Sequence, residues 1–175
     1  KAMVNLLPIE PDETINTIMP MPEDECTWGD LHIMFATASG SVRRNKLSDF
    51  TNIKRNGKIA MKLSEGDELV GVAPCNESDD LLLATRDGKA IRFAVEAVRV
   101  FRGRDSTGVR GIKLLGKDSV VSMSIITDPE REFVLSVTEN GYGKRTAVSD
   151  YRQTGRGGQG VANIETSERN GQVMA

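Results

Sequence analysis

Short apolar runs that end in glycine turns recur along the chain. Each run has the length and continuity of a strand buried on both faces. The runs are residues 31–37, 81–85 and 133–138, and they end at Ser39-Gly40, Asp87-Gly88 and Asn140-Gly141. The last two pairs suit a tight hairpin turn in which both central residues have positive φ. The pattern therefore predicts three hairpins.

The hairpins belong to a longer repeat. Their turn glycines are 48 and 53 residues apart, and an arginine follows each glycine by four positions, at Arg44, Arg92 and Arg145. A second element, with glycine first and an apolar residue fifth, recurs in phase at 57–63, 108–114 and 160–166. A third, in which an acidic or polar residue precedes a short apolar strand, occurs at 13–18, 67–72 and 118–123. The chain holds about three periods.

About four antiparallel strands every 50 residues predict an all-β, propeller-like array of four-stranded blades. We expect one domain fragment over 1–175, with repeats at about 13–63, 67–114 and 118–166 and a partial repeat at each end. Because a repeat buries its apolar face mainly against its neighbours, an array with a partial repeat at each end is expected to be cut from a longer one. Helical content is expected to be low, with a single turn within 94–101.

Composition indicates the class of protein and where it is located. With 38% hydrophobic and 27% charged residues the chain is typical of a soluble globular protein. It has no apolar run near the roughly 18 residues of a membrane span and no secretory signal pattern, so we expect a cytoplasmic protein. Cys26 and Cys75 lie far apart in acidic, loop-like stretches, and they predict neither a disulfide framework nor a metal site.

Charge follows the repeat, and the net charge of −2 conceals this. Residues 41–62 carry +6, residues 85–117 carry +6 and residues 140–160 carry +3, with acidic segments between them. The second strand of each hairpin places cations on a face or edge that we expect to lie outside the core. If successive blades superpose, these cations line a rim that can follow the phosphates of a polyanion. The alternative is that the charges only keep the protein soluble.

Duplex DNA is the favoured polyanion because aromatic residues, at 5%, are too sparse for a platform that stacks single strands. No helix that reads bases is predicted, so contact should be to the backbone, with low specificity. The predicted DNA-binding residues are Arg43, Arg44, Lys46, Lys89, Arg92, Arg99, Arg102, Arg104, Lys144, Arg145, Arg152 and Arg156.

The densest glycine cluster is the segment from Gln153 to Gly160, here called the glycine-rich loop. Its glycines either let the backbone approach a phosphate or satisfy positive φ in a long turn. Its candidate contact residues are Gln153, Gly155, Arg156, Gly157, Gly158 and Gly160.

Enzymatic chemistry is not predicted for this chain. It has no GxxxxGK[ST] phosphate loop, and its one histidine, His32, lies in a predicted buried strand. Its carboxylates lie in acidic loops without a partner base. We therefore expect a binding protein with no cofactor and no metal.

Four segments carry a resemblance to a known family, namely residues 4–13, 57–72, 106–114 and 139–151. They resemble blade sequences of the C-terminal domain of the A subunit of bacterial DNA gyrase. The resemblance implies a β-pinwheel, in which neighbouring blades exchange strands and a basic rim wraps DNA. For the whole enzyme it implies negative supercoiling with ATP and Mg, and an A2B2 assembly of the A subunits with the ATPase (B) subunits.

The family also has a glycine-rich box, QRRGGKG, usually in the first blade. The glycine-rich loop is similar, but it lies in a later blade, has Gln159 in place of the second basic residue and is one residue longer. Since the cleaving tyrosine and the metal-binding domains have no counterpart here, this chain alone should neither cut DNA nor hydrolyse ATP. The alternatives are the related domain of the topoisomerase IV A subunit and, in another class, a propeller-like scaffold for protein partners.

Overall fold

The computed structural model describes residues 15–51, 53 and 57–175. Ten strands and four short 3-10 turns make up its regular structure, which confirms the all-β prediction. The strands are β1 (His32–Thr37), β2 (Ser41–Lys46), β3 (Leu69–Cys75), β4 (Asp80–Thr85), β5 (Lys89–Ala94), β6 (Val109–Arg110), β7 (Val120–Ile126), β8 (Phe133–Val137), β9 (Gly143–Ala147) and β10 (Val161–Ala162). The 3-10 turns are η2 (Glu25–Gly29), η3 (Leu47–Phe50), η4 (Val95–Ala97) and η5 (Val148–Asp150).

The three predicted hairpins are present, as β1–β2, β4–β5 and β8–β9. Their turns differ from the predicted tight type. In the first, the amide of Gly40 donates to the carbonyl of Thr37, and the same bond recurs 48 and 53 residues later. The glycines have φ of 84°, 83° and 79°. Each glycine is therefore the fourth residue of a four-residue turn and has a left-handed backbone conformation. This is the geometry of a three-residue hairpin loop, which asparagine-glycine and aspartate-glycine sequences also suit.

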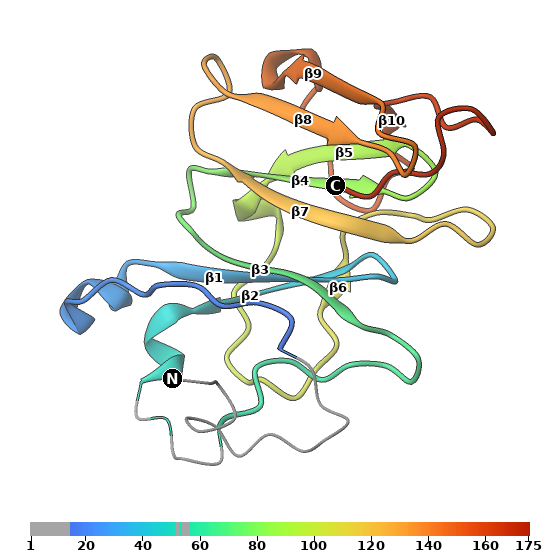
Figure 1. The fold of residues 1–175 in the computed structure, drawn as a ribbon. Helices are drawn as coiled ribbons and strands as arrows, with labels where there is room; N and C mark the ends of the chain where they lie inside the picture. Colours follow the sequence, from blue (N-terminus) through green and yellow to red (C-terminus); the bar gives the residue numbers. More distant parts are fainter. Residues whose placement is uncertain (1–14, 52, 54–56) are drawn as a thin grey trace, which may run out of the picture.

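Neighbouring hairpins exchange strands. The first sheet has the order β3-β1-β2-β6 and the second β10-β5-β4-β7 (Figure 1). Although β6 follows the second hairpin in the chain, it pairs with β2 of the first. Likewise β10 follows the third hairpin and pairs with β5. We call each hairpin with the strands that pair to it a blade.

A glycine marks each point of exchange. A Cβ on Gly108 would lie 2.3 Å from the carbonyl oxygen of Val42 in β2, and one on Gly160 would lie 2.5 Å from that of Ala90 in β5. Both glycines also have positive φ. The close backbone approach and the positive φ together explain why the second repeat element begins with glycine.

The blades stack face to face, and alternate residues of each strand serve different neighbours. Met34 and Ala36 of the first blade share a core with Leu81 and Leu83 of the second. Leu82, on the opposite face of β4, belongs to a separate cluster with Val148 and Tyr151 from the third hairpin region. The hairpin of the second blade is thus buried between two neighbours.

The outer face of the first blade is covered by the segment that precedes it. Ile33 and Phe35 pack with Met19, Met21 and Trp28 of that segment. Although a strand was predicted at 13–18, residues 15–18 form none, and residues 13–14 lie outside the described part, as does the partial repeat before them. The element at 57–63 also forms no strand. Its counterparts β6 and β10 pair with the preceding hairpin, and the described chain has no hairpin before β1.

The third blade is the least complete. Residues 172–175 lie beside β8, since the amide of Val137 donates to the carbonyl of Ala175 and that of Met174 to Val137. Phe133 and Leu135 are 54% and 64% exposed. The prediction that residues 133–138 are buried on both faces is therefore wrong, because no further sheet among the described residues packs on that side.

Candidate nucleic-acid interface

Eight of the twelve cations predicted to contact DNA are exposed. They are Lys46, Lys89, Arg99, Arg102, Lys144, Arg145, Arg152 and Arg156. Arg92 and Arg104 are half-buried, and Arg43 and Arg44 are buried. The expectation that the second strand presents its cations outside the core is thus wrong for Arg43 and Arg44 of the first blade and for Arg92 of the second, which have partners within the protein.

Arg43 is fully buried and braces a loop. Its Nε donates to Asn45 Oδ1 at 2.8 Å, its Nη1 donates to the carbonyl of Ser106, and its guanidinium lies 5.0 Å from the Phe101 ring centroid. Asn45 Nδ2 donates to the carbonyls of Phe101 and Gly103. Burial lowers the pKa of Arg43. These two side chains hold the 101–107 connection against β2.

Arg44 is also buried, and its nearest acid is Glu77, with Nη1 3.3 Å from Oε1. The Glu77 side chain is 62% exposed, so solvent screens this pair and its contribution to stability is small. The backbone carbonyl of Arg44 accepts the amide of Phe101. The recurrent arginine of the first blade therefore also contacts the connection to β6.

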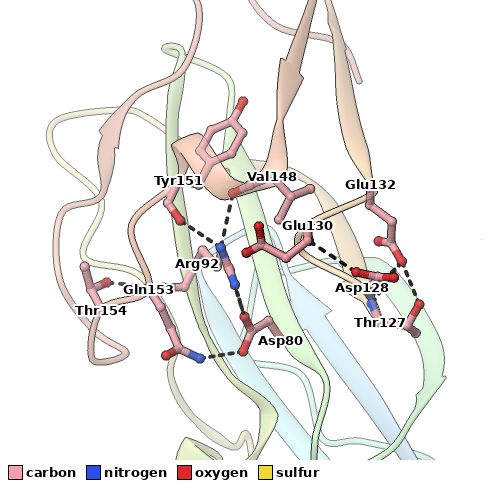
Figure 2. Close-up of polar contacts among 10 residues, drawn as sticks. All are labelled: Asp80, Arg92, Thr127, Asp128, Glu130, Glu132, Val148, Tyr151, Gln153 and Thr154. Carbon is pink, nitrogen blue, oxygen red and sulfur yellow. Dashed lines mark hydrogen bonds and ion pairs between the residues drawn. The ribbon is translucent and has the colours of Figure 1, made fainter.

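Arg92 occupies the same repeat position and forms a polar network that joins the second and third blades (Figure 2). Its Nε and Nη2 lie 2.7 Å and 2.6 Å from Asp80 Oδ2. Its Nη1 donates to the carbonyls of Val148 and Tyr151, both at 3.1 Å. Arg92 thereby joins the second blade to the 3-10 turn η5 of the third hairpin.

Arg145, the third member of the series, is exposed. Its guanidinium lies 4.3 Å from the centroid of the Phe133 ring, a cation–π contact on the uncovered face of the third blade. The side chain at this repeat position is therefore 4% and 11% exposed in the two covered blades and exposed in the uncovered third blade. A single sequence cannot distinguish these surroundings.

The glycine-rich loop lies against the connection that leads from η4 to β6 and against residues 111–113, which follow β6. Arg156 donates from Nε to the carbonyl of Ala97 at 2.9 Å and from Nη1 to that of Arg110 at 3.1 Å. The amide of Gly157 donates to the carbonyl of Gly111, and that of Lys113 to Gly158. These bonds hold segments of two blades side by side.

This contact places two segments that carry exposed cations beside each other. We call this region the basic ridge and define it by six residues: Arg99, Arg102, Arg110, Lys113, Arg152 and Arg156. Arg110 and Lys113 were not among the predicted contacts, although they lie in the basic segment 85–117. Their position became apparent only from the packing of the two segments.

The carboxylates near the third hairpin have structural partners. Glu132 Oε1 accepts from the hydroxyl of Thr127 at 2.6 Å and from the amide of Asp128 at 3.0 Å, while the amide of Glu130 donates to Asp128 (Figure 2). The Thr127 hydrogen bond lowers the pKa of Glu132.

Across the described part of the chain, no group of three or more metal-ligating side chains occurs. No described helix is long and apolar enough to span a membrane.

Strand exchange, face-to-face blades and a basic outer connection define the class of β-pinwheel, or propeller-like, domains. A family model described as "DNA gyrase C-terminal domain, beta-propeller" matches residues 31–76, 79–127 and 132–175. This chain belongs to the DNA gyrase C-terminal domain family.

Relatives support the assignment. The chain is 41% identical over 234 residues to the DNA gyrase A subunit of Granulibacter bethesdensis and 46% identical over 175 residues to that of Salmonella typhimurium. These matches cover 100% and 99% of this chain but 25% and 19% of the relatives, so the chain spans a quarter of their length or less.

Two solved structures have the same fold. The C-terminal domain of DNA gyrase A superposes with a TM-score of 0.85 at 27% identity, covering 99% of this chain and 56% of the other. That of DNA topoisomerase IV superposes with a TM-score of 0.87 at 24% identity, covering 99% and 52%. At this identity the second match shows the fold alone.

Proposed function

We propose that this chain binds duplex DNA through its phosphates, without sequence preference. The observation that carries the proposal is the basic ridge, in which two connections from successive blades lie in contact and each carries exposed cations. Neutralising phosphates releases condensed counterions, which favours binding without base contacts. Membership of the gyrase family supports this choice of ligand.

Within this proposal the exposed cations and the glycine-rich loop make the contacts. Arg43, Arg44 and Arg92 take a different role, since their guanidinium groups are directed to protein acceptors. They support the connections that contact DNA. The three repeats proposed from the sequence then act as successive supports for one path of bound DNA.

The parent protein is proposed to be the A subunit of a DNA gyrase. By resemblance, its C-terminal domain wraps DNA in the cytoplasm so that the whole enzyme introduces negative supercoils using ATP and Mg. The partners in that enzyme are the rest of the A subunit and the ATPase (B) subunit, in an A2B2 assembly. This chain alone is not proposed to catalyse a reaction. The similar fold of the topoisomerase IV domain keeps that enzyme as the second candidate parent.

A titration of a 30-base-pair duplex at several salt concentrations tests the binding. Contacts to four to six phosphates predict that log K falls against log salt with a slope of about −4 to −5. Exchanging the duplex sequence should leave K within a few-fold. No binding at low salt, or a slope near zero, would refute DNA binding and favour the protein-scaffold alternative.

Wrapping is a separate claim with its own measurement. Bending 20–30 base pairs by 40–90° costs about 1–6 kcal/mol, which several contacts in register must offset. A nicked circle closed by ligase with the chain bound should have a shifted linking number if the DNA is wrapped with a fixed hand. An unchanged linking number at saturating protein would mean binding without wrapping.

A further inference from the structure

The glycine-rich loop is anchored at its start by a buried carboxylate. Asp80 is 5% exposed, and its Oδ1 accepts from Gln153 Nε2 at 2.7 Å while its Oδ2 binds the Arg92 guanidinium (Figure 2). The carbonyl of Arg92 accepts the amide of Thr154 at 2.9 Å. Asp80 and Arg92 thus fix the first two residues of the loop against the end of the β4–β5 hairpin.

The equivalent residues of the other blades cannot make this anchor. Asp80 lies twelve residues before the recurrent arginine, and that position holds His32 in the first blade and Phe133 in the third. His32 Nδ1 is buried without a hydrogen-bond partner in the described part, and Phe133 stacks on Arg145. Among the three blades, the anchor is therefore specific to the second, against which the start of the glycine-rich loop packs.

A carboxylate near a phosphate-binding loop would repel the ligand if it were free. Asp80 is instead shielded from solvent and paired with Arg92, so its charge is balanced within the fold. Its remaining oxygen is then available to orient Gln153. Asp80 therefore provides a fixed hydrogen-bond acceptor, and its paired charge repels an anion bound at the protein surface only weakly.

We infer that Asp80 is a positioning residue for DNA binding, acting through Gln153 and Arg92 to hold the glycine-rich loop in its binding conformation. The inference rests on the proposed function. Glycines make a loop entropically costly to order, and a loop ordered before binding does not incur that cost when DNA arrives. Phosphate contact requires this order because backbone amides must converge on one group.

The test uses Gln153→Ala, because Asp80→Ala leaves Arg92 without its buried partner and endangers the fold. The control is Ser149→Ala, an exposed neighbour in η5. Amide hydrogen exchange is followed at Thr154 and Gly157, which donate to the carbonyls of Arg92 and Gly111. Loss of a hydrogen bond to a carboxylate predicts about ten-fold faster exchange at these amides in Gln153→Ala.

Exchange in the β1–β2 hairpin should not change, which separates loop positioning from general destabilisation. Loop exchange equal to that of Ser149→Ala, or a uniform increase throughout the chain, would overturn the positioning role. A second arm adds a 30-base-pair duplex to the unmodified chain, and bound DNA should slow exchange at Thr154 and Gly157. If it slows neither amide, the loop does not contact DNA and the proposed function fails at this site, whatever the variant shows.

Discussion

Replacing Arg92 by methionine tests whether the recurrent arginines support the blades. The change keeps an unbranched side chain of similar length but removes the guanidinium from Asp80 and from the carbonyls of Val148 and Tyr151. The side chains of Arg92 and Asp80 are only 11% and 6% exposed. Removing one partner of a buried pair leaves the other charge uncompensated, which costs about 3–5 kcal/mol. The free energy of unfolding should fall by that amount.

The matched control is Arg145→Met, at the same repeat position but exposed. It loses mainly the contact with the Phe133 ring, worth about 0.5–1 kcal/mol at an exposed site. Urea unfolding followed by far-ultraviolet circular dichroism gives both values, provided that the slope with denaturant is unchanged. A loss below about 1 kcal/mol for Arg92→Met, or equal losses for the two variants, would refute the supporting role.

Three further predictions concern the frame of the site. Gly160→Ala should cost about 2–3 kcal/mol in urea unfolding, because its Cβ would lie 2.5 Å from the Ala90 carbonyl oxygen at a φ of 75°, whereas Gly155→Ala should stay within about 0.5 kcal/mol. Burial and Asp79 raise the pKa of Cys75 to about 12, so a thiol reagent at pH 8 should label only the exposed Cys26 in the native chain and both cysteines in denaturant. Burial raises the pKa of Asp67, but hydrogen bonds from Ser39 outweigh this and hold the pKa below that of an ordinary aspartate; its contribution to stability, measured against Asp67→Asn, should be present at pH 6 and be lost as the pH falls through the lowered pKa.

The hairpins and the repeat were predictable because their signals are local. Apolar runs, turn glycines and a fixed spacing identify β1–β2, β4–β5 and β8–β9 in the printed sequence. The single helical turn expected within 94–101 is present as the 3-10 turn η4. The sheets as assembled were not predictable from the residues alone, since β6 and β10 have two residues each and pair with a hairpin from the previous repeat.

The arginines show why the site was harder to predict. In sequence, Arg44, Arg92 and Arg145 are equivalent, and each follows its turn glycine by four residues. Their surroundings depend on which blade covers them, and on whether the position twelve residues earlier is histidine, aspartate or phenylalanine. Such contacts are set by tertiary packing, so charge patterning indicated a basic surface but not its members.

The dependence of DNA affinity on salt, compared between two charge-matched double variants, tests the central claim most directly. Arg102→Gln with Lys113→Gln removes two cations of the basic ridge, and Lys117→Gln with Arg131→Gln removes two exposed cations outside it. If DNA binds at the ridge, the slope of log K against log salt becomes shallower by about 2 in the first variant and is unchanged in the second. Equal slopes for the two variants would contradict binding at the ridge.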